Sequence, residues 1–204
     1  MNPSRTEHWD SIYATKTPDQ VSWTQAIPTH SLERIEKLHL SKNAKIVDVG
    51  GGDSLLVDSL LDLGYTDITV VDISELALKR AQARLGSRAQ KVKWVACDIV
   101  EFQPDENFDL WHDRAAFHFL NRPEEIQAYM DLVCRKVSGH AIVGTFSVDG
   151  PTKCSALQVQ QYDENSLSGM FQSHGFRSLE CARELHTTPS GGSQEFLFCT
   201  FSKS

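Results

Sequence analysis

The sequence predicts a single α/β domain with a doubly wound, mostly parallel sheet of seven strands that ends in an antiparallel hairpin. Two observations lead to this prediction. Between residues 44 and 147, apolar runs typical of strands alternate with segments typical of helices, and such alternation implies right-handed crossovers and a parallel sheet covered on both faces. Nearer the C-terminus, two strand-like runs are joined by a short glycine-rich turn, as in an antiparallel hairpin.

The first half of the core is expected to contain two strands and two helices. Gly64 and Gly86 follow helix-like runs and are suited to end them, and Ser74 is a good N-cap for the second helix. The expected elements are a strand over residues 44–50, a helix over residues 54–63, a strand over residues 67–73 and a helix over residues 74–85.

The second half is expected to add five strands and two helices. Pro123 suits the first turn of a helix, and Gly139 is expected to redirect the chain into the next strand. The expected elements are strands over residues 91–98 and 108–114, a helix over residues 123–137, a strand over residues 140–147, a helix over residues 163–174, and hairpin strands over residues 175–188 and 194–203.

The length and composition favour one ordinary globular domain. A chain of 204 residues can bury a sizeable core, and neither a repeat nor a linker divides it. We therefore expect residues 1–204 to form one domain, with the α/β core in residues 44–204 and a helical cap or lid in residues 1–43.

The charge pattern bears on partners and location. The formal net charge is −7, and the basic side chains are scattered, whereas phosphate backbones are bound by clustered lysines and arginines, so we expect no nucleic acid partner. No apolar run is long enough to span a bilayer, and the N-terminal residues lack the pattern of a secretory signal. We expect no membrane association, a cytoplasmic location, and a monomer or weak homodimer.

The cysteines are expected to be reduced thiols. They are odd in number, widely separated and without a CxxC pair, which indicates neither a metal site nor a disulfide framework. The five are Cys97, Cys134, Cys154, Cys181 and Cys199.

The stretch IVDVGGGDSLL, residues 46–56, places three glycines between the first strand and its helix. In a parallel sheet, loops at the carboxyl ends of strands bind ligands. A phosphate-binding loop would need Lys-Ser/Thr where Asp53 and Ser54 stand, and a dinucleotide fingerprint would need glycine where Leu55 stands. Asp48 and Asp53 favour a cationic ligand over a pyrophosphate. Taken alone, the loop could equally be a tight turn without a ligand.

Two further carboxylates are expected at the same edge of the sheet. Asp72 ends the second strand, where a carboxylate can accept hydrogen bonds from both hydroxyls of a ribose. Asp98, directly after Cys97, ends the third strand, where it could meet an adenine amino group.

These motifs resemble those of the class I S-adenosylmethionine-dependent methyltransferases. VDVGGGDS is similar to their first motif, VVDIS to the acidic strand end and ACDI to the adenine-side motif, and the resemblance extends over residues 44–203. It implies a Rossmann-like fold, S-adenosylmethionine as cofactor, and an approach of the Gly50–Gly52 backbone to the methionine portion, which Asp48 orients. Ser54 replaces a third glycine of many members. The expected cofactor-binding residues are Trp23, Asp48, Gly50, Gly51, Gly52, Asp72, Ile73, Cys97, Asp98, Ile99 and His112.

A closer resemblance concerns two other stretches. EHWDSIYATKTPDQVSW and WHDRAAFHFL are similar to a group of small bacterial methyltransferases, and the second is also similar to the lysine methyltransferase that modifies citrate synthase. This resemblance does not identify the acceptor.

The candidates for catalysis follow the fourth strand, in WHDRAAFHFLNR. Methyl transfer needs chiefly proximity and orientation, and a general base only if the nucleophile arrives protonated. We expect Asp113 or His118 to act as that base or to orient the acceptor. The alternatives are a structural ion pair between Asp113 and Arg114 and a packed His118.

The N-terminal aromatic residues Trp9, Tyr13 and Trp23 can anchor their segment by packing, or close over the cofactor as a lid with Trp23 against the sulfonium. The long segment after residue 147 is expected to form part of the acceptor wall, with Lys153 and Tyr162 as candidates. We expect a small-molecule acceptor. A lysine of a partner protein, and a non-catalytic cofactor-binding scaffold, are the alternatives.

Overall fold

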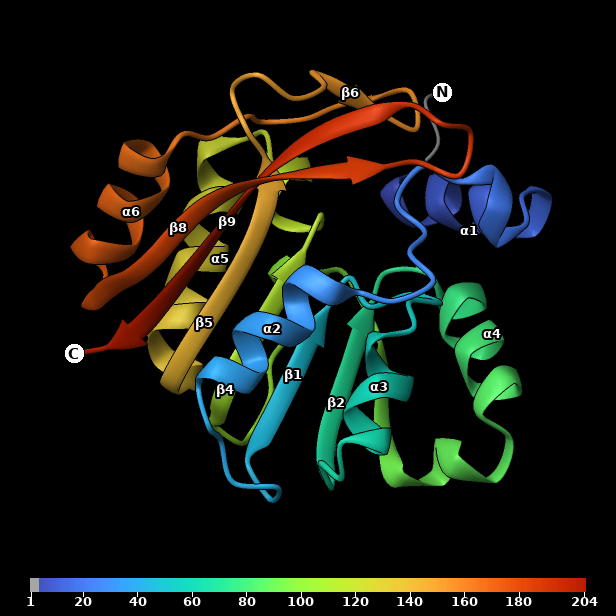
Figure 1. Cartoon of the computed structure of the whole chain (residues 1–204), viewed down its shortest axis with the longest axis horizontal. Coiled ribbons are helices and arrows are strands. Elements are labelled where there is room, and N and C mark those ends of the chain that lie inside the picture. Colours follow the sequence, from blue (N-terminus) through green and yellow to red (C-terminus); the bar gives the residue numbers. More distant parts are fainter. Residues whose placement is uncertain (1–3) are drawn as a thin grey trace.

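The computed structural model describes residues 4–204, and its centre is one sheet of seven strands in the order β3-β2-β1-β4-β5-β9-β8. β1, β2, β3, β4 and β5 are parallel to one another, whereas β9 runs antiparallel to both β5 and β8. This arrangement confirms the predicted fold class, including the C-terminal hairpin (Figure 1). The strands are β1 Lys45–Val49, β2 Asp67–Asp72, β3 Val92–Ala96, β4 Phe108–Arg114, β5 Val137–Phe146, β8 Phe176–Thr187 and β9 Ser193–Lys203.

Six α-helices and a small second sheet complete the described part of the chain. The predicted helix positions agree with the structure to within about two residues at each end. The helices are α1 Arg5–Thr15, α2 Thr29–Lys37, α3 Leu56–Asp62, α4 Glu75–Leu85, α5 Pro123–Lys136 and α6 Glu164–Ser173, and the small sheet pairs β6 Lys153–Cys154 with β7 Leu157–Gln158.

The start of β5 differs from the prediction. Gly139 was expected to turn the chain, but α5 passes directly into β5 at Val137 and Gly139 lies inside the strand. A Cβ at Gly139 would collide with the carbonyl oxygen of Asp109 on the neighbouring strand. The glycine is therefore explained by the close approach of β4, where the pairing register also shifts.

Helices cover both faces of the sheet and close two hydrophobic clusters. Ile35, Leu60 and Leu78, from α2, α3 and α4, lie in one cluster, and Tyr129 and Phe171, from α5 and α6, lie in the other. In Figure 1, α2 and α3 lie in front of the sheet and α5 lies behind it. Such two-sided burial explains why β1 and β2 read as nearly continuous apolar runs.

The N-terminal helix α1 is fastened to the carboxyl-end edge of the sheet by side-chain contacts. Arg5 forms ion pairs with Asp98 (2.9 Å) and Glu125 (2.5 Å), and the Ser74 hydroxyl donates to Asp10 (2.6 Å). Figure 1 shows α1 beyond the tips of β1 and β2, next to α4. Residues 16–28 then lead from α1 back to α2.

The expectation of five reduced cysteines is wrong for two of them. Cys181 on β8 and Cys199 on β9 are directly opposite each other in the antiparallel pair, and the structure joins them in a disulfide. Cys97, Cys134 and Cys154 are free. A spacing of 18 residues gives no sign of this bond, because only the register of the hairpin brings the two side chains together.

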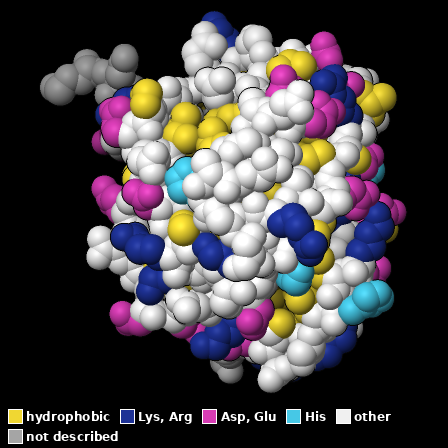
Figure 2. Space-filling view, turned by 90° about the vertical axis from the view of Figure 1, so that its left-hand side faces the viewer, with side chains coloured by type: hydrophobic (Ala, Val, Ile, Leu, Met, Phe, Trp, Pro, Cys, Tyr) yellow, Lys and Arg dark blue, Asp and Glu magenta, His cyan; other side chains and the backbone are white. Residues whose placement is uncertain are grey.

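The described surface carries charges of both signs. Figure 2, which looks onto the side of α6 and the C-terminus, shows basic and acidic side chains interspersed on that face. Within residues 4–204, no helix combines the length and the apolar character that crossing a membrane requires.

Candidate active site

A cavity of about 380 Å³ opens where the first four parallel strands end, beneath α1 and residues 16–28. Ten of the eleven residues predicted to bind a cofactor line it. These are Trp23, Asp48, Gly50, Gly51, Asp72, Ile73, Cys97, Asp98, Ile99 and His112. Gly52 lies next to it, and its backbone N–H favours the ionised form of the Asp72 carboxyl.

The glycine loop is shaped by both conformation and close contact. Gly50 and Gly52 have φ of +65° and +48°, in the left-handed region that glycine adopts readily. A Cβ at Gly50 would lie 2.6 Å from the Cβ of Ala116, in the turn after β4. The loop therefore needs glycine where it passes the cavity, which supports the tight-turn explanation, and the approach of the loop to a ligand stays a prediction.

Asp72 is a buried carboxylate at the rim of the cavity. The Ser74 N–H donates to its Oδ1 (2.8 Å). Burial raises the pKa of Asp72 to about 7, although the backbone N–H groups of Ser74 and Gly52 oppose that rise. A carboxylate has about four acceptor positions, so Asp72 retains capacity for hydroxyl donors of a ligand.

His112 is held between two elements at the floor of the cavity. Its Nδ1 lies 2.7 Å from Asp48 Oδ1, and its Nε2 lies 2.8 Å from the hydroxyl oxygen of Ser31 on α2. All three residues are buried. Both ring nitrogens are therefore engaged, which fixes the orientation of Asp48 and leaves His112 unsuited to act as a mobile base.

Asp98 is already partnered on both oxygens. Val100 N–H donates to its Oδ1 (3.2 Å), and Arg5 Nη1 donates to its Oδ2 (2.9 Å). The same carboxylate thus borders the cavity and holds α1 in place. Beside it, burial raises the pKa of the Cys97 thiol to about 11, so this thiol stays protonated at neutral pH.

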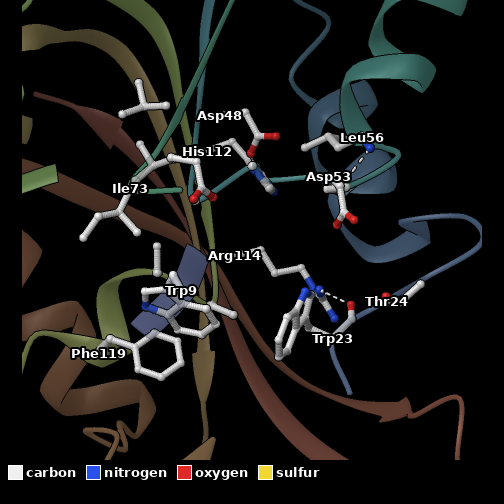
Figure 3. Close-up of a pocket in the computed structure, with 18 of the residues that line it drawn as sticks. Trp9, Trp23, Thr24, Asp48, Asp53, Leu56, Ile73, His112, Arg114 and Phe119 are labelled. Carbon is white, nitrogen blue, oxygen red and sulfur yellow. Dashed lines mark hydrogen bonds and ion pairs between the residues drawn. The ribbon is translucent and has the colours of Figure 1, made fainter. Parts of the chain in front are cut away.

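Aromatic rings enclose the other side of the cavity. Trp9 packs edge-on against Trp23 (ring centroids 5.6 Å apart) and against Phe119 (5.0 Å). Figure 3 shows these three rings opposite the side that carries Asp48 and Asp53. The cavity therefore has an acidic side and an aromatic side.

Arg114 lies on the aromatic side and is the functional candidate that the sequence analysis missed. Its Nη1 donates to the Trp23 carbonyl oxygen (3.0 Å), and its guanidinium lies over the Phe196 ring, 4.9 Å from the centroid. Burial lowers its pKa to about 10, so it remains charged at neutral pH. Figure 3 shows it extending into the centre of the site.

A signal for Arg114 was present in the strand pattern. Side chains alternate between the two faces of a strand, so His112 and Arg114 share one face of β4, and Asp113 points to the other. An ion pair between Arg114 and Asp113, the role expected for Arg114 from the sequence, is disfavoured by this alternation.

The structure corrects the expectation that Asp113 contacts the acceptor. Its side chain is fully buried behind the cavity. Asp113 Oδ1 accepts from Ala116 N–H (3.0 Å) and Phe117 N–H (3.1 Å), and its Oδ2 accepts from the Tyr129 hydroxyl (2.8 Å). Asp113 therefore holds the turn that follows β4, in which Ala115 has a positive φ of 68°.

The expectation for His118 is corrected as well. Its ring is fully buried, packs 4.6 Å from the Phe119 and Phe146 rings, and accepts from Phe146 N–H through Nδ1 (3.2 Å). Burial lowers the pKa of His118 to about 3. It is a packed, neutral histidine that contacts the lining residues Phe119 and Phe146 but does not itself line the cavity.

The two residues predicted for the acceptor wall lie outside the lining of the cavity. Tyr162 is buried against Phe117, and Lys153 is exposed, and neither lines the cavity. The lining residues on this side are instead Phe146, Cys154, Gln194 and Phe196, from the ends of β5, β6 and β9. In residues 4–204, no group of three or more histidine, cysteine or acidic side chains is placed to hold a metal ion.

Replacing Asp113 with alanine is expected to lower the free energy of unfolding by about 3 kcal/mol, because three buried donors lose their acceptor. Asparagine, which keeps one acceptor oxygen, should lose less. Urea denaturation measures the stability, and calorimetry with S-adenosylhomocysteine should find unchanged affinity in the folded variants. A fully stable Asp113→Ala protein without turnover would return Asp113 to a catalytic role.

Comparison with known proteins agrees with this geometry. Residues 46–137, which include the glycine loop and β1 to β4, match the family model described as a methyltransferase domain. The match covers somewhat less than half of the chain, and it identifies residues 46–137 as similar to a methyltransferase domain. The 1,6-didemethyltoxoflavin-N1-methyltransferase of Burkholderia thailandensis, solved with bound S-adenosylhomocysteine, has the same fold, with a TM-score of 0.68 and 20% identity over 95% of this chain and 81% of that chain.

Curated relatives of the domain are named for different acceptors. The mouse eEF1A lysine and N-terminal methyltransferase is 28% identical over 122 residues, 58% of this chain. The malonyl-[acyl-carrier protein] O-methyltransferase of Anoxybacillus flavithermus is 29% identical over 125 residues, 58% of this chain. The matches span 17% and 47% of the lengths of these two relatives, so they relate the domain and not the whole proteins.

Proposed function

We propose that this protein transfers the methyl group of S-adenosylmethionine to a small-molecule acceptor in the cytoplasm. The observation that supports the proposal most is the division of the cavity into an acidic side, suited to a sulfonium cofactor, and an enclosed aromatic side with Arg114 as its charged group. Ligand cavities of this size with few polar groups are typical of sites for small molecules.

The residues of the acidic side fit the cofactor. The Gly50 to Gly52 loop borders the cavity in a close packing that only glycine permits, and Asp72 has acceptor capacity for two ribose hydroxyls. We place the adenine beside Cys97, Asp98 and Ile99, and the methionine portion beside Asp48. When bound, the cofactor would supply a methyl group activated by its positive sulfur, and in-line attack by an acceptor lone pair would release S-adenosylhomocysteine. The chain contributes binding, orientation and exclusion of water.

The aromatic side has no evident general base among the residues that the structure describes. Apart from Arg114, its titratable lining groups are Cys154 and Tyr13, which packs against Trp23, and burial raises the pKa of both. We infer that the acceptor presents a lone pair that is already free at neutral pH, such as that of a carboxylate or an unprotonated nitrogen. Trp23 beside the cavity would also favour the sulfonium through cation–π attraction.

A lysine of a partner protein is the second candidate. The mouse relative is named for a lysine and an N-terminus of a protein, and WHDRAAFHFL resembles the citrate synthase lysine methyltransferase. Against it, the aromatic side lies beneath α1 and residues 16–28, and a lysine ammonium would approach the Arg114 cation. A non-catalytic scaffold is the third candidate, and it would bind the cofactor without turnover.

Incubating the protein with fractionated lysate and cofactor carrying a tritiated methyl group tests the proposal. We expect label to enter the small-molecule fraction, and formation of S-adenosylhomocysteine to depend on that fraction. The Gly50→Ala variant, expected to bind the cofactor weakly, serves as the control. Label confined to a protein band would replace the proposal with the second candidate, and no label anywhere would favour the scaffold.

A further inference from the structure

The Arg114 guanidinium is a buried charge that the proposed cofactor placement leaves without a partner. We propose that Arg114 binds a carboxylate of the acceptor, so that the substrate is an anionic small molecule with an apolar body. This inference rests on the proposed function and specifies the acceptor class at the same site.

The unpaired donors of Arg114 have the geometry that a carboxylate requires. Nη1 is occupied by the Trp23 carbonyl oxygen, whereas Nε and Nη2 have no hydrogen-bond partner among residues 4–204. The N–H groups of Nε and Nη2 lie on one edge of the guanidinium and point in parallel, which matches the two oxygens of a carboxylate. The bond to Trp23 leaves this edge as the available one.

The surroundings make an unpaired charge unfavourable. Nε and Nη2 are both buried, and the guanidinium rests on the Phe196 ring. The negative charge of Asp48 offsets only part of the effect of burial. A buried charge is normally paired, because desolvation without a counter-ion is costly. A ligand carboxylate would supply both the counter-charge and the two missing hydrogen-bond acceptors.

The position of Arg114 favours the acceptor over the cofactor as the source of this carboxylate. Asp48 and Asp72, the residues placed beside the cofactor, lie on β1 and β2. Arg114 lies on β4 and is paired with β5, on the side of β4 that faces away from β1. Its guanidinium lies over Phe196 of β9. The neighbouring rings of Trp9, Trp23 and Phe119 offer apolar surfaces to the rest of the ligand.

The closed arrangement also indicates how the acceptor enters. Because Nε and Nη2 are covered, a ligand reaches them only when the surrounding chain shifts, and the segment of residues 16–28 contacts the same guanidinium through Trp23. In the described structure two hydrogen bonds tie the middle of this segment to the sheet, from Arg114 to the Trp23 carbonyl and between His186 Nε2 and the Ser22 carbonyl oxygen (2.6 Å). Arg114 thus contacts both the segment and the acceptor position, so binding and closure are expected to be coupled.

Calorimetry on the protein saturated with S-adenosylhomocysteine tests the inference with two probes of one shape, benzoate and benzamide. We expect benzoate to bind the wild-type protein at least about 10-fold more tightly than benzamide, since charge-assisted bidentate bonds are stronger than neutral ones. R114Q should remove this preference, and R114K, which keeps the charge but not the fork, should keep only part of it. Equal binding of the two probes to the wild-type protein would overturn the inference.

A second measurement separates the two sources of carboxylate. The affinity for S-adenosylhomocysteine should change less than about 3-fold in R114Q, a difference below 1 kcal/mol, and this also shows that the variant is folded. If R114Q instead weakens S-adenosylhomocysteine strongly but leaves its decarboxylated analogue unchanged, Arg114 serves the cofactor and the inference is wrong.

These outcomes are distinct from failure of the proposed function. Label in a protein band would contradict the small-molecule acceptor, whatever the affinity measured for benzoate. Label in the small-molecule fraction, combined with equal binding of benzoate and benzamide, would contradict only the role of Arg114.

Discussion

Replacing Gly50 with alanine is expected to weaken binding of S-adenosylhomocysteine by at least about 100-fold, or roughly 3 kcal/mol. The new Cβ would lie 2.6 Å from the Cβ of Ala116, on a backbone with φ of +65°. Either the glycine loop or the turn after β4 must therefore move, and both border the cavity. Calorimetry measures the affinity, and circular dichroism and thermal unfolding show whether the fold is kept.

Gly64→Ala is the matched control for this variant. Gly64 also has a positive φ, of 85°, but an added Cβ there would meet nothing within 4 Å. Both substitutions should lose about 1 kcal/mol of stability from backbone strain, and only the one at Gly50 should lose cofactor affinity. Equal affinities in the two variants would mean that the loop does not approach the cofactor closely.

Replacing Asp72 with asparagine is expected to weaken binding of S-adenosylhomocysteine about 30-fold at pH 8, or roughly 2 kcal/mol, because charge-assisted hydrogen bonds to the ribose become neutral ones. Asp67→Asn, at the opposite end of the same strand, should leave the affinity unchanged. Without bound cofactor, the Asp72→Asn protein should be at least as stable as the wild type at pH 8. The reason is that burial disfavours the charged carboxylate, which asparagine replaces with a neutral amide.

The pH dependence of binding follows from the raised pKa of Asp72, about 7. Below this pH the empty protein carries a protonated Asp72, and binding through the carboxylate must release that proton. Affinity should therefore rise from pH 6 to pH 8 in the wild type and stay flat in Asp72→Asn. Calorimetry in two buffers of different ionisation enthalpy would detect the released proton, and its absence near pH 6 would contradict the role assigned to Asp72.

Stability of the empty protein should respond to pH in the opposite direction. The folded-state pKa of Asp72 lies above the ordinary value of 3.8, so the folded state binds more protons than the unfolded chain between these values. The contribution of Asp72 to stability is full below about pH 4 and is lost as the pH rises through about 7. Thermal midpoints of wild type and Asp72→Asn should accordingly diverge as the pH rises from about 4 to about 7 and keep a constant difference above that.

Local patterns in the sequence were sufficient to predict the fold and the cofactor side of the cavity. Periods of two and 3.6 residues, with glycine and proline at the ends, placed the strands and helices. The glycine loop and the acids Asp48, Asp72 and Asp98 depend only on their positions at strand ends, and parallel strands bring those ends to one edge of the sheet. These properties are set by neighbours along the chain.

Only the tertiary structure decided the aromatic side of the cavity. Asp113 and Arg114 are adjacent in sequence, and the packing of α5 buries Asp113 against Tyr129 and leaves Arg114 at the cavity. The hairpin register alone brought Cys181 to Cys199. Each of these outcomes depends on contacts between residues far apart in the chain, which local pattern and propensity do not encode, and so they emerge only when the sheet is assembled.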